Sequence, residues 1–251
     1  MQKRLARSVN RLLNGLGCRI VPLKDAGFPP DMDAATVSAF EAVRPCTMTS
    51  IERVSALRDA IRYVSARGIE GDIAECGVFK GGSMMVAARL LQELNDIRTL
   101  HLFDTFEGMP PPSDVDREFN TRSAKDALAS EDRATSDVWA VGPLDVVKKN
   151  MSSTGYPAER INYVQGLVED TIPRQAPEKI ALLRLDTDWY ESTKHELEHL
   201  YPRLAEGGVL IIDDYGHWQG ARKAVDEYFA QLDRPPLLCR IDYTARLCLK
   251  V

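Results

Sequence analysis

The sequence predicts an α/β fold, in which a parallel sheet carries helices on both faces. From residue 71 onward, short apolar segments alternate with segments of helical periodicity, which is the signature of such a sheet. The last two apolar segments are separated only by Tyr243 and Thr244, and so short a link requires an antiparallel hairpin. Five parallel strands and a terminal hairpin make seven strands, an order that differs from the all-parallel dinucleotide-binding fold.

Length and composition fit one domain with a large core. The chain has 251 residues, of which 44% are hydrophobic and 27% charged, with a formal charge of -5. No basic stretch follows the first twenty residues, so nucleic acid is not an expected partner. The five cysteines show no C-x-x-C spacing, which predicts buried thiols rather than a zinc knuckle or disulfides. No apolar run approaches the ~20 residues that span a bilayer. We therefore expect a cytoplasmic protein.

Residues 1–46 are predicted to form a helical N-terminal arm. Basic residues at positions 3, 4, 7, 11 and 19 precede the first acid, Asp25, and apolar residues recur at helical spacing between them. This pattern is typical of a helix that lies on an anionic membrane surface, so peripheral membrane contact is one prediction. The alternative is an arm that packs on its own domain or on a second copy of the chain, and we expect a homo-oligomer. A further short helix is predicted for 34–43, before Pro45.

Residues 47–251 are predicted to form the α/β domain. A helix over 51–66 begins after the capping residues 47–50 and stops at Gly68. Strands are expected near 72–78, 99–104, 161–166, 181–186, 208–213, 237–242 and 245–251, and helices near 82–95, 143–151, 190–204 and 220–232. The insertion at about 107–142 leaves the sheet where ligands bind, so we interpret it as a lid, with a disordered surface loop as the alternative.

Acidic residues follow two of the strands that read as fully buried. Asp186 follows the strand over 181–185, and Asp213 and Asp214 follow the strand over 208–212. Carboxyl ends of parallel strands share one edge, where open α/β sheets bind ligands. Together with Asp188, four carboxylates gathered there would repel one another unless a cation lies among them or some stay protonated. The sequence thus predicts a divalent metal site, with Asp186 and Asp188 on opposite faces if the strand continues.

A glycine-rich turn follows the first strand and opens the helix near Ser83. A dinucleotide fingerprint would need glycine in place of Phe79, and a phosphate loop would need its lysine after the glycines, whereas Lys80 precedes them. The remaining signal is Glu75 at the strand tip. An acid there suits an ammonium group, such as that of S-adenosylmethionine, better than a pyrophosphate. A purely structural glycine turn is the alternative.

Two further strand ends suit a nucleoside. Asp104 ends the second strand, where an acid accepts hydrogen bonds from ribose hydroxyls, and Phe106 is placed to cover the nucleoside. Gly166 ends the third strand, where adenine would lie flat, with Leu167 and Val168 as apolar contacts. For Asp104 a loop or helix-cap role is the alternative, and the signal at Gly166 is weak by itself.

Four segments, 75–83, 103–109, 185–190 and 212–216, resemble the macrocin O-methyltransferase family, which includes sugar O-methyltransferases of macrolide and novobiocin biosynthesis. The similarity runs from about residue 47 to residue 229, with the motifs in the same order. It implies a class I methyltransferase fold and methylation of a sugar hydroxyl, on a glycoside or a glycan, that depends on S-adenosylmethionine and Mg²⁺. The first 30 residues and the interior of the lid match nothing in the family, so the acceptor stays open.

The resemblance assigns roles to particular positions. It implies metal ligands at Asp186, Asp213 and Asp214 and a general base at Asp188, for which capping of the helix near Tyr190 is the alternative. It places the loop after Glu75, Asp104 and the segment around Thr47 at the cofactor. The full set of cofactor-binding candidates is Thr47, Met48, Glu75, Cys76, Gly77, Gly81, Gly82, Ser83, Asp104, Thr105, Phe106, Gly166, Leu167, Val168 and Asp186.

Elementary chemistry agrees with this reaction. A sugar hydroxyl stays protonated at neutral pH, and Mg²⁺ prefers oxygen ligands and keeps positions open for substrate oxygens. A nearby carboxylate then accepts the proton, an effect of about 10²–10⁴-fold. Two other hypotheses are a metal-dependent O-methyltransferase of catechols or phenols and a non-catalytic assembly partner. His195, Glu196 and His199 match the spacing of a zinc protease, but the surrounding nucleotide-binding sheet argues against that reading.

Overall fold

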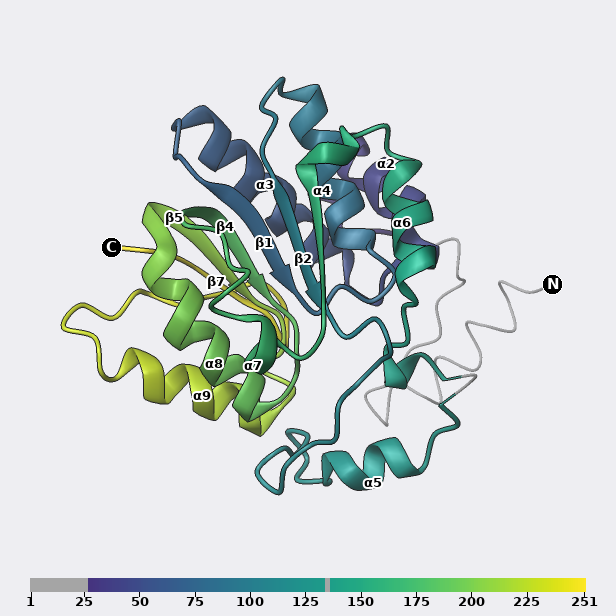
Figure 1. Cartoon of the computed structure of the whole chain (residues 1–251), viewed down its shortest axis with the longest axis vertical. Coiled ribbons are helices and arrows are strands. Elements are labelled where there is room, and N and C mark those ends of the chain that lie inside the picture. Colours follow the sequence, from purple (N-terminus) through teal and green to yellow (C-terminus); the bar gives the residue numbers. More distant parts are fainter. Residues whose placement is uncertain (1–26, 134–135) are drawn as a thin grey trace, which may run out of the picture.

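The computed structural model describes residues 27–133 and 136–251, so the basic N-terminal helix predicted for 1–22 lies outside the described residues. A single seven-stranded sheet runs through the molecule in the order β3-β2-β1-β4-β5-β7-β6 (Figure 1). The strands are β1 (Asp72–Cys76), β2 (Leu100–Asp104), β3 (Ile161–Gln165), β4 (Ile180–Leu185), β5 (Leu204–Ile212), β6 (Cys239–Arg240) and β7 (Arg246–Leu249). The first five are parallel, and β7 is antiparallel to both β5 and β6, as predicted.

Helices cover both faces of the sheet (Figure 1). One group consists of α2 (Ala34–Val43), α3 (Ile51–Ala66), α4 (Gly82–Glu93) and α6 (Leu144–Ser152), and the other of α7 (Val168–Thr171), α8 (Tyr190–Leu200) and α9 (Gln219–Phe229). Short 3-10 helices lie at Arg44–Cys46, Asp137–Trp139, Ala158–Arg160 and Tyr201–Arg203. A separate hydrophobic cluster fills the space beneath each helical layer. No helix among the described residues is long and apolar enough to cross a membrane, and the described cysteines form no disulfide.

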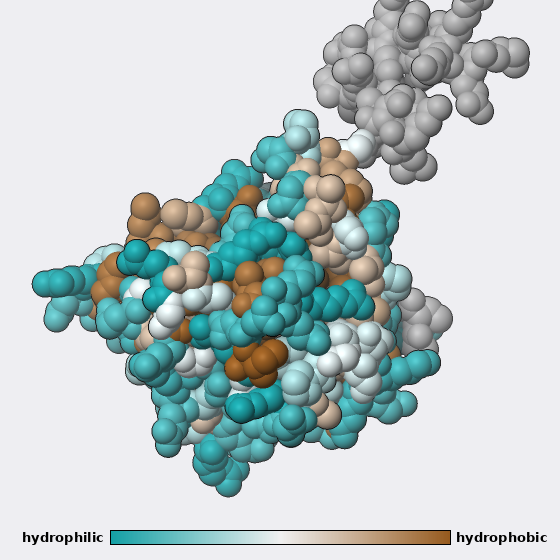
Figure 2. Space-filling model, turned by 90° about the horizontal axis from the view of Figure 1, so that it is seen from above, coloured by the Kyte–Doolittle hydropathy of each residue, from teal (hydrophilic) through white to brown (hydrophobic). Residues whose placement is uncertain are grey.

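The strand register aligns the ends of the central strands. Cys76 at the end of β1 pairs with Phe103 of β2 and with Leu185 of β4, and Leu185 pairs in turn with Ile212 of β5. The residues that follow these positions therefore leave the sheet at one level and on one edge. Figure 2 views the molecule from the opposite edge, at the top of Figure 1, where the surface is mostly hydrophilic with scattered apolar patches.

Two boundaries differ from the sequence prediction. The helix expected over 190–204 ends at Leu200, because Pro202 cannot continue it, and the chain turns through a 3-10 helix into a longer β5. The final hairpin has a five-residue link rather than two. Its tip is fixed by Asp242, whose carboxylate accepts hydrogen bonds from the backbone N–H groups of Thr244 (2.9 Å) and Ala245 (2.8 Å).

The segment before α3 is held close to the glycine turn. Helix α2 forms at the predicted residues, 34–43, and packs on α3 and α4. A Cβ atom at Gly82 would lie 2.6 Å from Thr47 Cβ and 2.7 Å from the Cys46 carbonyl oxygen. Glycine at this position therefore allows the Thr47 segment to cross directly over the start of α4.

The described part of the 107–142 insertion is folded rather than a disordered loop. It contains α5 (Ala124–Ala129), which packs with Trp139 against Trp189 and Trp218 at the starts of α8 and α9. The buried carboxylate of Asp116 anchors it and accepts a hydrogen bond from the Tyr190 backbone N–H (2.8 Å). In Figure 1 the insertion covers the edge of the sheet where the strands end. This is the position predicted for a lid, and its opening and closing stay predictions.

Candidate functional site

A cavity opens at the carboxyl edge of the parallel strands. Its wall combines the glycine turn, the ends of β2 to β5, the segment before α3 and the lid. Of the residues predicted from the sequence, it is lined by Thr47, Met48, Gly77, Ser83, Asp104, Thr105, Gly166, Leu167, Val168, Asp186, Asp188, Asp213 and Asp214. The lining also includes Arg53, Phe79, Arg184 and Met109. The fold thus brings together side chains from positions 47 to 214 around one space.

Five predicted cofactor residues lie outside this lining, and each has a structural role. Gly81 precedes α4 in the left-handed conformation, and Gly82 packs against the segment before α3. Phe106 is buried in the hydrophobic cluster beneath α3 and α4. Cys76 is buried too, and its thiol contacts the carboxyl group of Glu196. The proposed cover of a nucleoside by Phe106 finds no support in this arrangement.

Glu75 is the fifth. Its carboxylate is 1% exposed and is bonded to the Arg184 guanidinium at 2.6 Å. Burial raises the pKa of Glu75 to about 8, although the charge of Arg184 acts in the opposite direction. The expected direct contact of Glu75 with a cofactor ammonium is therefore not supported, because its charge is directed at Arg184 beneath the cavity.

Asp104 lies on the cavity wall and orders the glycine turn. Its Oδ2 accepts hydrogen bonds from the backbone N–H groups of Val78 (2.6 Å) and Phe79 (3.1 Å), and its Oδ1 from that of Phe106 (2.7 Å). Burial raises the pKa of Asp104, and these hydrogen bonds oppose the rise. Oδ2 already accepts two hydrogen bonds, whereas Oδ1 keeps a lone pair beside its bond to Phe106, so a hydrogen bond from a ribose hydroxyl to Oδ1 is compatible with this geometry.

Three of the four predicted acids form a compact cluster. Asp186 follows β4 directly, Asp213 and Asp214 follow β5, and one oxygen from each lies within 4.8 Å of the others. Burial raises the pKa of Asp186 to about 6 and raises that of Asp214, with neighbouring carboxylates adding to both. Carboxylate oxygens at this spacing are the donors that Mg²⁺, Ca²⁺ or Mn²⁺ prefers. The residues present therefore fit a hard dication.

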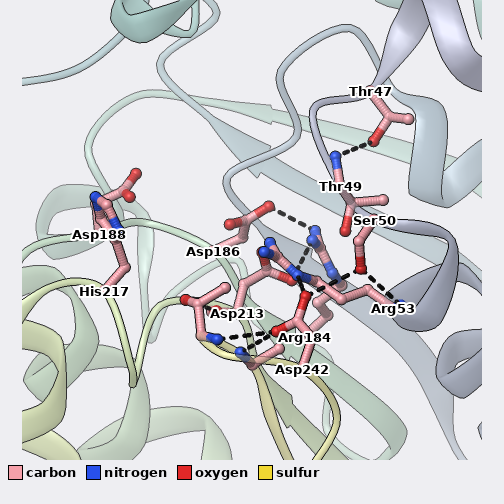
Figure 3. A network of polar contacts seen from close by, with 12 residues as sticks. Thr47, Thr49, Ser50, Arg53, Arg184, Asp186, Asp188, Asp213, His217 and Asp242 are labelled. Atoms are coloured by element: carbon pink, nitrogen blue, oxygen red, sulfur yellow. Dashed lines mark hydrogen bonds and ion pairs between the residues drawn. The ribbon is translucent and has the colours of Figure 1, made fainter. Parts of the chain in front are cut away.

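Two arginines already share this negative charge. Arg184, inside β4, bonds to Glu75, to Asp186 (2.7 Å) and to Asp213 (2.6 Å). Arg53, in the first turn of α3, bonds to the other oxygen of Asp213 and to Asp242 (2.7 Å) in the last hairpin. Figure 3 shows Asp213 between the two guanidinium groups. Asp214 has no salt bridge among the described residues, and its carboxyl group contacts that of Asp188 instead.

Asp188 lies at the edge of this cluster, where its carboxyl group contacts that of Asp214. Its φ of 66° is left-handed, so the strand does not continue to it, and its Oδ1 accepts a hydrogen bond from Trp218 Nε1 at 2.5 Å. In Figure 3 its side chain lies on the side of the site where His217 is drawn, apart from Asp186. Burial raises the pKa of Asp188 to about 7, and the charge of Asp186 adds to the rise. Asp188 does not cap the following helix, since Asp116 of the lid bonds to the Tyr190 N–H. A strained backbone conformation of this kind is typical of functional positions.

Glu196 supports the turn that carries Asp186 and Asp188. Its fully buried carboxyl group accepts a hydrogen bond from the Thr187 hydroxyl (3.1 Å). His195 Nε2 instead lies 3.0 Å from the Ile172 carbonyl oxygen. The zinc-protease spacing thus belongs to a helix whose central acid points into the core. Burial raises the pKa of Glu196 well above its usual range.

We expect the stability of the protein to depend on the protonation of Glu196. A carboxyl group whose pKa is raised in the folded chain stabilises the fold when it is protonated. This contribution is complete below the pKa of the unfolded chain, about 4.3, and is lost as the pH rises above it. Urea unfolding between pH 5 and pH 8 should therefore give a fall in the free energy of unfolding with pH. Glu196→Gln should make that slope shallower, by up to about 1.4 kcal/mol per pH unit. Equal slopes for the two proteins would show that Glu196 is ionised in the fold.

Four charged residues of the site were not among those predicted from the sequence: Arg53, Arg184, Asp116 and Asp242. Only Arg184 carries a local signal, because a charge inside an otherwise apolar strand requires a buried partner. The other three lie in a helix, the lid and a hairpin, and nothing in their neighbouring residues distinguishes them from surface charges. Their roles depend on partners between 74 and 189 residues away.

The chain is similar to known O-methyltransferases. A family model described as macrocin-O-methyltransferase (TylF) matches residues 36–248. An 8-demethyl-8-(2,3-dimethoxy-alpha-L-rhamnosyl)-tetracenomycin-C 4'-O-methyltransferase of Streptomyces olivaceus is 34% identical over 203 residues, covering 79% of this chain and 73% of the relative. Demethyldecarbamoylnovobiocin O-methyltransferase of Streptomyces niveus is 33% identical over 198 residues, covering 78% and 72%. The solved O-methyltransferase NovP superposes with a TM-score of 0.69 at 30% identity, covering 82% of each chain.

Proposed function

The chain belongs to the macrocin O-methyltransferase family and is therefore a methyltransferase. From this premise we propose that it methylates a sugar hydroxyl of a glycoside or glycan. The proposed methyl donor is S-adenosylmethionine, and the proposed metal is Mg²⁺. The observation that carries the proposal is the cluster of Asp186, Asp213 and Asp214 beside Asp188 on the wall of one cavity. The names of its relatives, which include a rhamnosyl-tetracenomycin and a mycinamicin O-methyltransferase, support a glycosidic acceptor.

The cofactor is assigned to the part of the cavity between the glycine turn and the end of β3. Asp104 would accept hydrogen bonds from the ribose hydroxyls, and Leu167 and Val168 would contact the adenine. Gly77 has a φ of 82°, and a Cβ atom there would lie 1.9 Å from the Asp186 carbonyl oxygen. Glycine at this position lets β1 and β4 end side by side, so the methionine end of a donor at the glycine turn would lie next to the acids.

Asp186, Asp213 and Asp214 would hold the metal. When bound, Mg²⁺ supplies charge that acidifies a coordinated sugar hydroxyl. The protein's own part is to bring the cluster together and to limit its repulsion, which Arg184 and Arg53 achieve by sharing the charge of Asp213.

Asp188 is the proposed proton acceptor. In the transfer the sugar oxygen forms a bond to the methyl carbon, the bond from that carbon to sulfur breaks, and the hydroxyl proton passes to the Asp188 carboxylate. Trp218 fixes the orientation of this carboxylate through its Nε1 hydrogen bond to one of the two oxygens. A pKa of about 7 suits a general base that works near neutral pH.

The proposal is tested with S-adenosylmethionine labelled in its methyl group and a panel of rhamnosides, other glycosides, oligosaccharides and catechols. We expect label to enter glycosides. Label in catechols alone would instead support the metal-dependent phenolic alternative. Failure to bind S-adenosylmethionine in calorimetry would contradict the proposal and favour a non-catalytic partner.

We predict one dication site that depends on Asp214. Mn²⁺, a spectroscopic substitute for Mg²⁺, should bind with a stoichiometry of one in electron paramagnetic resonance titrations, and Mg²⁺ should compete with it. Asp214→Asn should weaken this binding by at least tenfold, because it removes a ligand that has no salt bridge. The matched control is Asp226→Asn, an exposed acid elsewhere. Equal Mn²⁺ binding by both variants would exclude Asp214 as a ligand.

A further inference from the structure

A second hollow lies beside the acid cluster, separated from it by one indole ring. It is a groove formed by the lid, the turn after β5 and the outer face of α9. Its lining is Phe119, Tyr215, Gly216, His217, Trp218, Gln219, Arg222, Lys223, Asp226 and Glu227. Trp218 belongs to this groove, and its Nε1 bonds to Asp188 on the wall of the cavity. A molecule in the groove would therefore lie about one ring width from the proposed base.

Aromatic rings gather around His217 of the groove lining, and one of them, Tyr243, lies beside the lining rather than in it. The His217 ring has its centroid 4.8 Å from that of Trp218, 5.8 Å from Phe119 and 6.1 Å from Tyr243. The rings come from the lid, the turn after β5 and the last hairpin. Phe119 is 62% exposed and Tyr243 is 56% exposed. Two large rings thus offer faces to solvent around a partly buried imidazole, which is unusual for side chains that only stabilise a fold.

The exposed phenyl ring is held on an ordered backbone. The Gln219 N–H donates to the Arg117 carbonyl oxygen (2.8 Å), and the Gln219 side-chain amide donates to that of Glu118 (3.0 Å). These bonds fix the lid on both residues before Phe119, and a β-bridge between Glu118 and Trp218 adds to them. Phe119 is therefore placed over His217 by backbone contacts rather than by its own burial. Such preorganisation lowers the entropy cost of binding.

Paired charges form the floor of the groove on successive turns of α9. Arg222 lies 3.5 Å from Asp226, and Lys223 lies 2.6 Å from Glu227. Tyrosine hydroxyls hold both acids in place, with Tyr215 donating to Asp226 (2.7 Å) and Tyr190 to Glu227 (2.7 Å), while the half-exposed charges stay accessible. They offer both donors and acceptors to a ligand rich in hydroxyl groups.

We propose that this groove binds a second sugar ring of the acceptor, the neighbour of the ring that is methylated. The inference rests on the proposed function, since it assumes a sugar at Asp188. A pyranose has an apolar face of C–H groups, which suits the exposed rings of Phe119 and Tyr243, and hydroxyl groups at its edge, which suit the charged pairs of α9. A flat aromatic aglycone would match the rings but would make no hydrogen bonds with the charged floor.

The test compares di- and monosaccharides. A printed array of mono-, di- and trisaccharides, rhamnose-containing ones included, is probed with the labelled full-length protein in the presence of S-adenosylhomocysteine. The strongest disaccharide and its terminal monosaccharide, both as methyl glycosides, are then titrated. We expect the disaccharide to bind about tenfold more tightly, and Phe119→Ala and Tyr243→Ala to reduce this ratio towards one. Leu237→Ala, at an exposed apolar residue that neither lines the groove nor makes a ring contact with His217, should keep the wild-type ratio.

Three outcomes would overturn the proposal: no disaccharide bound on the array, a ratio unchanged by both variants, or a wild-type dimer in light scattering that Phe119→Ala converts to monomers. The last would identify the rings as a contact between copies of the chain. Methyl transfer is measured separately, so the two proposals can fail independently. A disaccharide that binds through Phe119 without being methylated would contradict the proposed function alone. In another outcome, wild type and Phe119→Ala both methylate glycosides and show the same preference for the disaccharide. That result would contradict the proposal for the groove but not the proposed function.

Discussion

Replacement of Asp188 by asparagine is expected to lower kcat for methyl transfer by about 10²–10⁴-fold. Asparagine keeps the size of the side chain and can still accept a hydrogen bond from Trp218 Nε1, but its amide does not take up the hydroxyl proton. The loss should appear in kcat, since Asp188 acts on the reacting oxygen and not on binding. Steady-state formation of S-adenosylhomocysteine, with the glycoside found in the acceptor panel, measures it.

Two controls make this prediction specific. Calorimetry should give the same Kd for S-adenosylmethionine in wild type and Asp188→Asn, because the cofactor is assigned to the glycine turn and the end of β3. Asp137→Asn makes the same change at an exposed acid of the lid. Its kcat shows the effect of an aspartate-to-asparagine change at a residue that is not the proposed base. A kcat for Asp188→Asn within threefold of wild type would rule out Asp188 as the base.

Arg184→Met is expected to lower the free energy of unfolding by about 3–5 kcal/mol. Arg184 is 4% exposed and compensates Glu75, Asp186 and Asp213 at once. Methionine fills most of the volume but leaves three buried carboxylates without their shared cation, and their repulsion is then opposed only by Arg53 at Asp213. Urea unfolding followed by circular dichroism, at pH 7 and without metal, gives the difference.

The matched control is Arg222→Met, which removes an exposed ion pair with Asp226 and should cost at most about 1 kcal/mol. The double variant Glu75→Gln with Arg184→Met should recover part of the loss, because one of the buried carboxyl groups left without its partner is removed with the arginine. Equal losses for Arg184→Met and Arg222→Met would mean that the buried network adds nothing beyond a surface pair.

Much of the fold and part of the site follow from local sequence. The alternation of apolar strands and helices predicted the five parallel strands and the terminal antiparallel pair. This was possible because the residue patterns of strands and of helices can each be recognised within a short segment. The acids after β4 and β5 could be assigned to one edge, since the ends of parallel strands must share it. Asp186, Asp213 and Asp214 do meet there. The resemblance of four motifs then indicated the family, to which the chain belongs.

The tertiary structure decided what these acids contact. Glu75 was expected at the cofactor. However, β4 lies between β1 and β5, and this places Arg184 against Glu75 and Asp213. No single segment of the sequence determines that strand order. The left-handed turn that points Asp188 at Trp218 likewise depends on α9 and the lid. Sequence by itself determined the elements and their chemistry, because these depend on neighbouring residues. Only the folded chain determined the charge partners and the groove beside Asp188, because these depend on residues brought together from distant positions.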